Sequence, residues 1–290
     1  MATTNEGSMR HEALLFIAAA IWGTGFVAQR LGMLSLPPFA FSGARFAIGA
    51  LSLVPLIVFR KTSWQTLRAA LGPGLLAGAV LSVAANLQQT GILYTSAGKA
   101  GFITGIYVVL VPIAATMLGR HSSSRIWLGA LLAFAGLFFL SIKDGFSMER
   151  GDLIVLISAF FWTAHLLILD RWAPRVDPIA LAATQFAVCS ILSWAVAFPA
   201  ESFKAGDFVR GMGPLLYGGL ASIGIAYTLQ AVAQTKAHPA RASIILSLEA
   251  VFAALAGWLF LNELLSLREL LGCAFMLGGI VLAQLPDRAN

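Results

Sequence analysis

The chain has 290 residues, of which 59% are apolar and only 11% carry a charge. Water-soluble domains carry about 25% charged residues, so the composition excludes that class and indicates a membrane protein. In a membrane protein the net charge of +6 is interpreted from where the cations lie beside the spans. It therefore does not indicate a nucleic-acid partner, and none is expected.

Apolar segments of membrane-spanning length follow one another along the chain, separated by short polar connections. Crossing the hydrocarbon core takes roughly 20 apolar residues, and a helix satisfies its own backbone hydrogen bonds there. We therefore predict an all-α membrane protein with ten transmembrane helices. The predicted spans cover residues 13–33, 39–59, 71–94, 100–118, 126–142, 153–169, 179–198, 214–233, 242–261 and 270–285.

The cations are unevenly divided between the two faces that these spans define. The ends and connections on the face that carries the N-terminus hold ten Lys and Arg residues and five acids, whereas the opposite face holds seven of each. Cytoplasmic connections carry an excess of Lys and Arg. This asymmetry predicts that both termini are cytoplasmic.

The two halves of the chain match each other at an offset of 140 residues. Each half contains five predicted spans, an odd number, so the halves must face opposite ways, as in the inverted repeats of secondary transporters. We predict two five-helix repeats, residues 1–145 and 146–290, with the second inverted. The most informative matches are Trp22/Trp162, Pro38/Pro178 and, at an offset of 143, Gly129/Gly272 and Gly136/Gly279.

Small residues in the last span have a spacing suited to close contact between helices. Gly272, Gly278 and Gly279 would allow the backbone of another helix to approach, as small residues do in membrane helix pairs. We interpret these glycines as packing residues.

Several stretches resemble one known family. They are AAIWGTGFVAQR, SGARF, GFITGIYVVLVPIAATMLGRHSSSRIWLGALLAFAGLFFL and SIILSLEAVFAALAGWLFLNELLSLRELLGCAFMLGGIVLAQL. They are similar to the drug/metabolite transporter superfamily, specifically its ten-span members built from two EamA-type domains. The Asn262-Glu263 pair at the end of the ninth predicted span matches the acidic residue that the family usually has at that position, whereas the first repeat has Ser122-Ser123. The resemblance implies a carrier in the bacterial inner membrane, and bacterial amino-acid exporters are the nearest fit.

Polar side chains at membrane depth are costly and therefore mark candidate functional positions. For the neutral amides, hydrogen bonding that only holds the bundle together, worth about 0.6 kcal/mol per contact, is the alternative. Tyrosines join an apolar ring to a hydroxyl and are further candidates. The intramembrane polar candidates are Arg45, Asn86, Gln88, Gln89, His165, Gln185, Gln230 and Glu249. The predicted substrate-binding residues are Trp22, Trp162, His165, Asn86, Gln89, Tyr107, Tyr227 and Gln230.

Trp22 and Trp162 lie deeper in their spans than the interfacial belt in which Trp usually anchors. Because the two residues are equivalent in the repeat, we predict that they form walls of one central cavity from opposite halves. Packing in the core or against lipid is the alternative interpretation.

Arg45 and Glu249 are predicted to serve in gating or coupling, as partners of each other. At about 1.5 Å per residue, Glu249 lies about 15 Å beyond Pro239, and Arg45 lies about 10 Å beyond Pro38 on the opposite face, so the two differ by only ~5 Å in depth. Paired, they would hold one state closed; separated, they would meet the two charges of a zwitterion. A static structural pair or a neutral carboxyl group is the alternative.

The chain lacks the patterns that membrane enzymes need for nucleophilic or metal chemistry. It contains no GxSxG, HExxH or GKS/T sequence, and Cys189 and Cys273 lie in apolar runs without metal-ligand spacing. We therefore expect no enzyme activity, no cofactor and no bound metal.

The favoured function is export of small metabolites, above all aromatic or other partly apolar amino acids, by alternating access. A proton-coupled multidrug or cation efflux pump is the main alternative, although the first span of each half contains no acid. A nucleotide-sugar carrier would need several buried cations, and a channel would need rings of polar groups. The expected partners are a small-molecule substrate and the lipid bilayer; a monomer suits the sequence, which does not fix the oligomeric state.

Overall fold

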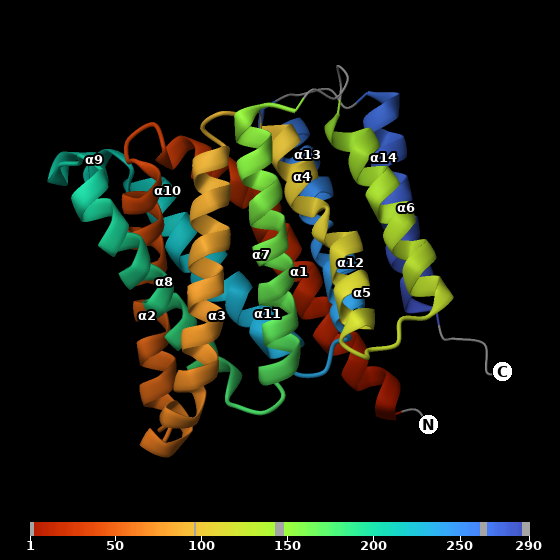
Figure 1. Cartoon of the computed structure of the whole chain (residues 1–290), viewed down its shortest axis with the longest axis horizontal. Coiled ribbons are helices and arrows are strands. Elements are labelled where there is room, and N and C mark those ends of the chain that lie inside the picture. The colour runs from red at the N-terminus through yellow and green to blue at the C-terminus, as the bar shows by residue number, and fades with distance from the viewer. Residues whose placement is uncertain (1–2, 96, 143–147, 262–265, 286–290) are drawn as a thin grey trace.

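The computed structural model describes residues 3–95, 97–142, 148–261 and 266–285, and these residues form helices and connections without a strand. The helices run alongside one another in one bundle (Figure 1). Nine described segments are long and apolar enough to cross a bilayer, and the shorter apolar helix Ser124–Leu140 accounts for the tenth predicted span. The prediction of an all-α membrane protein is confirmed.

The helices of the first half and of the second half follow the predicted order of the spans. In the first half they are α1 (Thr3–Gly32), α2 (Pro38–Phe59), α3 (Trp64–Gly91), α4 (Ala97–Gly105), α5 (Tyr107–Met117) and α6 (Ser124–Ser141). In the second half they are α7 (Arg150–Trp172), α8 (Pro178–Ala200), α9 (Ala205–Arg210), α10 (Met212–Leu216), the π-helix η1 (Tyr217–Tyr227), α11 (Thr228–Ala233), α12 (Pro239–Leu246), α13 (Glu249–Leu261) and α14 (Leu267–Gln284).

Residues that favour helix starts set where several spans begin. Proline lacks a backbone donor and has a helical φ, so it suits the first turn; α2, α8 and α12 each begin with one. Asp177 caps α8 by accepting from the amides of Ile179 and Ala180 at 3.0 and 2.9 Å. The Glu201 carboxylate, at the far end of α8, accepts from the first amides of α2. The acidic residues at the two ends of α8 therefore cap the first turns of α8 and of α2.

Two spans are interrupted at equivalent places in the two halves. The fourth span breaks at Ile106, between α4 and α5, and the ninth breaks at Ser247 and Leu248, between α12 and α13. At the repeat offset, Ile106 corresponds to Leu246. The eighth span is also irregular, because its middle is the π-helix η1, whereas its counterpart α3 is a continuous α-helix.

The main helix contacts recur when each span is exchanged for its counterpart. Helix α3 packs on α7, and its counterpart η1 with α11 packs on α1; α1 packs on α12 and α13, as α7 packs on α4 and α5. Two pairs join counterparts directly: α2 with α8, and α6 with α14. The α6–α14 pair forms one edge of the bundle (Figure 1).

Glycines bring α6 and α14 into backbone contact. A Cβ atom added at Gly129 would lie 2.6 Å from the carbonyl oxygen of Gly279, and one added at Gly136 would lie 2.5 Å from that of Gly272. Under the repeat, Gly129 is the counterpart of Gly272 and Gly136 is that of Gly279, so the contacts are reciprocal. Reciprocal contacts of this kind characterise a two-fold interface. By contrast, a Cβ at Gly278 would meet only the end of the Leu132 side chain, at 3.4 Å.

The two neighbouring glycines of α14 give a matched test of this packing. Gly279→Ala should lower the stability of the folded protein by about 1–3 kcal/mol, the usual cost of overpacking, because its methyl group would collide with α6. Gly278→Ala should be neutral or slightly stabilising, since alanine has the higher helix propensity. Melting temperatures of the detergent-solubilised variants measure the difference, and equal melting temperatures would contradict the packing.

Candidate functional site

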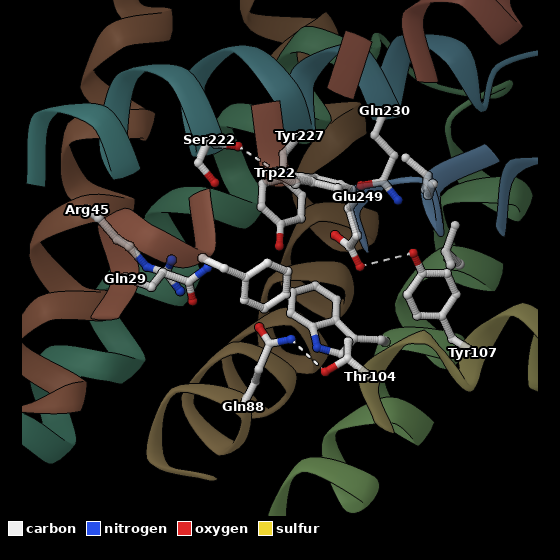
Figure 2. Close-up of a pocket in the computed structure, with 14 residues that line it drawn as sticks. Trp22, Gln29, Arg45, Gln88, Thr104, Tyr107, Ser222, Tyr227, Gln230 and Glu249 are labelled. Atoms are coloured by element: carbon white, nitrogen blue, oxygen red, sulfur yellow. Dashed lines mark hydrogen bonds between the residues drawn. The ribbon is translucent and has the colours of Figure 1, made fainter. Parts of the chain in front are cut away.

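One pocket lies where both interrupted spans meet the middle of the bundle, and ten of the helical elements contribute to its lining (Figure 2). Thr104 and Tyr107 flank the break of the fourth span, and Leu246 and Glu249 flank that of the ninth. Interrupted helices in corresponding positions of two repeats are the usual location of a transporter's binding site. Of the ten residues predicted for binding, gating or coupling, seven line this pocket: Trp22, Arg45, Tyr107, Trp162, Tyr227, Gln230 and Glu249.

Three aromatic rings form the middle of the pocket wall. Tyr227, at the end of η1, lies 4.5 Å from Trp22 and 6.1 Å from Trp162 between ring centroids, and it is stacked on Trp162 with an interplanar angle of 20°. The Trp22 indole Nε1 donates a hydrogen bond of 3.1 Å to the backbone oxygen of Ser222, within η1. The predicted pair of tryptophans therefore meets at one pocket, with Tyr227 in contact with both rings.

Arg45 lines the pocket from α2 and is only 4% exposed. Its guanidinium carbon lies 5.5 Å from the centroid of the Phe41 ring and 5.3 Å from that of Phe46. Cation–π contacts of this kind partly compensate for lost hydration. Within the described part of the chain, its Nε atom has no hydrogen-bond partner.

Glu249 is the first residue of α13, directly after the break in the ninth span. The hydroxyl of Tyr107, the first residue of α5, donates to its Oε1 atom at 3.3 Å. The two helix breaks are thus joined by a side-chain contact at the pocket.

The expected pairing of Arg45 with Glu249 is absent from the described residues, among which no ion pair joins them. Figure 2 shows them at different places around the aromatic rings of Trp22 and Tyr227. The reason is lateral position: α13 packs on α1, whereas α2 packs on η1 and α8. Similar depth does not bring these two side chains together.

Three predicted binding residues lie outside the pocket lining. Asn86 donates hydrogen bonds of 2.8 Å to the Ser82 backbone oxygen and to Ser193 Oγ, which links α3 to α8. His165 Nε2 is 2.9 Å from Gln185 Oε1. Gln89 is fully buried. The contacts of Asn86 and His165 favour the alternative in which such side chains hold helices together.

The pocket lining also includes residues outside the predicted binding set, among them Phe26, Gln29, Thr104 and Gln88, of which only Gln88 was an intramembrane polar candidate. Trp22, Phe26 and Gln29 recur at the i, i+4 and i+7 spacing of one helix face and all line the pocket. Gln88 Nε2 donates to Thr104 Oγ1 at 2.9 Å, and both residues belong to the lining. Gln29 lies two turns after Trp22 on the same helix face, and this spacing is the sequence signal that would have identified it.

The bundle is closed at the end where α5 and α7 terminate, which the charge asymmetry predicts to be cytoplasmic. Arg120 Nη2 and Asp170 Oδ2 form an ion pair of 2.8 Å between the polar ends of these helices. Gln234 Nε2 donates to the Leu166 backbone oxygen at 2.9 Å. A buried apolar cluster fills the space between this end and the pocket; it includes Leu15, Ala18, Val111, Ala233 and Ile245.

A bundle of apolar helices around a pocket at paired helix breaks defines a multi-pass membrane transporter. The model of the EamA-like transporter family matches residues 9–142 and 149–285. The chain belongs to the EamA-like transporter family, within the drug/metabolite transporter superfamily. The Asn262-Glu263 pair, whose glutamate is part of the resemblance seen in the sequence, lies outside the described residues.

Relatives across bacteria and archaea agree with this assignment. An uncharacterized transporter of Archaeoglobus fulgidus is 32% identical over 273 residues, covering 93% of this chain and 84% of its own. The uncharacterized transporter YoaV of Bacillus subtilis is 24% identical, covering 90% and 91%. The uncharacterized inner membrane transporter YedA of Escherichia coli is 25% identical, covering 93% and 89%.

A protein of known crystal structure shares the fold. It superposes with a TM-score of 0.80 at 20% sequence identity, covering 94% of this chain and 97% of its own. The likeness shows that the architecture recurs across most of the chain.

The paired tryptophans give a direct test of the pocket. Trp22→Ala and Trp162→Ala should each reduce transport at least tenfold, because each removes a large ring from the contact with Tyr227, while membrane insertion is retained. Trp258→Ala is the matched control, since Trp258 is 51% exposed on the outside of α13 and should transport normally. Flux per folded molecule is the measurement, and wild-type rates in both pocket variants would show that the rings only pack.

Proposed function

We propose that the protein is an inner-membrane exporter of small, partly apolar amino acids. The observation that carries this proposal is a single pocket that combines aromatic walls with one cation, Arg45, and one carboxylate, Glu249. An aromatic or aliphatic side chain would be buried against Trp22, Trp162 and Tyr227, since mostly apolar walls with a few placed polar groups suit small ligands. The two charges complement the two ends of a zwitterion.

We further propose that transport proceeds by alternating access between two inverted repeats, residues 1–145 and 146–290. The reciprocal glycine contacts of α6 with α14, and the corresponding breaks at Ile106 and at Ser247 and Leu248, support a two-fold relation between the halves. The proposed route to the cytoplasm passes the Arg120–Asp170 ion pair. Opening the cytoplasmic end requires this ion pair to separate. In the same step the two repeats would exchange conformations, which would close the opposite end of the bundle.

A cation efflux pump is the second candidate, and the carboxylate of Glu249 is the observation that favours it. A carboxylate among aromatic rings would bind a lipophilic cation. Arg45 in the same pocket argues against it, because a buried guanidinium repels such a substrate. For either candidate we propose that the protein lies in a bacterial inner membrane with both termini in the cytoplasm.

The substrate class can be tested in cells and with purified protein. Overexpression should raise resistance to toxic aromatic amino-acid analogues, and proteoliposomes should exchange labelled phenylalanine or leucine in a saturable manner. Protein-free liposomes and the Trp22→Ala variant are the controls. Extrusion of quaternary cations without flux of any amino acid would replace the proposal with the cation pump.

The role of Glu249 is tested by removing its charge. Glu249→Gln should lower turnover or flatten the dependence of transport on pH, because the variant keeps the shape of the side chain but loses the titrating group. Flux in proteoliposomes from pH 5.5 to 8.5 is the measurement, with an unchanged melting temperature as the control. Wild-type flux at every pH would show that the carboxylate is dispensable for gating and coupling.

A further inference from the structure

The buried guanidinium of Arg45 is the strongest unexplained feature of the pocket. Its contacts within the described residues are aromatic rings, at 5.3 and 5.5 Å, and no described carboxylate forms an ion pair with it. Ionisable residues inside a membrane protein almost always pair with another group. The charge is therefore available to a partner that enters the pocket.

Comparison of the two halves shows that packing does not require this charge. The counterpart of Arg45 at the repeat offset is Gln185, a neutral amide whose oxygen is bound to His165 Nε2. Both residues lie beside glycines that are counterparts in the repeat: the Gln185 backbone lies beside Gly78, and the Arg45 side chain lies beside Gly218. The same place in the bundle is thus filled by a neutral side chain in one half and by a cation that lines the pocket in the other.

The surroundings of Arg45 have the chemistry of a site for a carboxylate with an apolar body. A guanidinium presents paired donors in a planar fork that matches the two oxygens of a carboxylate. Gln29 lines the pocket beside it in the view of Figure 2. The Phe46 ring, which the guanidinium covers, is 6.3 Å from Tyr227, and Tyr227 is 4.5 Å from Trp22. Aromatic surface therefore extends from the cation into the middle of the pocket.

We infer that Arg45 binds the carboxylate of the transported molecule and is the residue that selects acids over their neutral analogues. The inference rests on the proposed amino-acid export for the identity of the molecule, with its ammonium group directed to Glu249. The recognition step itself needs only a monocarboxylate with an aromatic or aliphatic body. A dicarboxylate is disfavoured, because its second charge would approach Glu249.

Binding measurements test the inference without using transport. The purified wild-type protein is titrated with 3-phenylpropionate and with its neutral isostere 3-phenylpropanamide, with tryptophan fluorescence as the signal, since Trp22 and Trp162 line the pocket. The acid should bind at least tenfold more tightly than the amide. Equal binding of the two ligands, or no saturable response to the acid, would overturn the inference.

Variants then assign the preference to one residue. Arg45→Gln should bring the acid and the amide to within about twofold of each other, and Arg45→Lys should keep part of the preference. Arg241→Gln is the control, because it removes a cation of α12 that does not line the pocket. A full preference in Arg45→Gln would overturn the inference; if that variant does not fold, the comparison of acid and amide on the wild-type protein decides, and equal binding there overturns it.

The outcome is separable from that of the proposed function. A strong preference for the acid that depends on Arg45, without flux of any amino acid, would refute amino-acid export and leave the carboxylate site in place. Amino-acid flux with equal binding of acid and amide would support amino-acid export and refute the carboxylate site at Arg45.

Discussion

An unpaired backbone amide or carbonyl costs several kcal/mol in hydrocarbon, so a membrane helix is interrupted only where protein or a polar cavity receives the freed groups. In this chain the interruptions at Ile106 and at Ser247 and Leu248 occupy equivalent places in the two halves, and both open onto the same pocket. The π-helix η1 adds a third irregular segment to the same wall, as π-turns often do at functional sites. The position of the pocket follows from these three irregular spans.

The regular helices hold those irregular spans in place. Helices α6 and α14 contact each other through reciprocal glycines, and Glu201 at the end of α8 caps the start of α2. Each of these two pairs joins a helix of the first half to its counterpart in the second half. Exchanging the halves therefore leaves both pairs in place. The remaining contacts join α2 to η1, η1 to α1 and α1 to α13. Arg45 and Glu249 therefore line the pocket from different helices, α2 and α13.

Hydropathy and the internal repeat were sufficient to predict the ten spans, because length and apolar content alone decide what crosses a bilayer. They also selected Trp22 and Trp162, since matched tryptophans at depth are rare. The breaks were not predicted: Gly105 directly precedes the first break, but Gly is common in membrane helices, and neither Ser247 nor Leu248 is Pro or Gly. Pro112 lies within the continuous helix α5. The separation of Arg45 from Glu249 was missed because counting residues gives depth but not lateral position. Gln29 was missed because it lies near the end of its span.

Cross-linking the closed end of the bundle shows whether transport requires that end to open, as alternating access demands. Cysteines would replace Arg120 and Asp170 in a chain whose native Cys189 and Cys273 are changed to alanine, and a bis-maleimide with a cleavable disulfide spacer would join them. The two single-cysteine variants control for the modification itself. With alternating access, amino-acid flux should fall at least tenfold on cross-linking and return when the spacer is reduced. Undiminished flux through the cross-linked protein would contradict it.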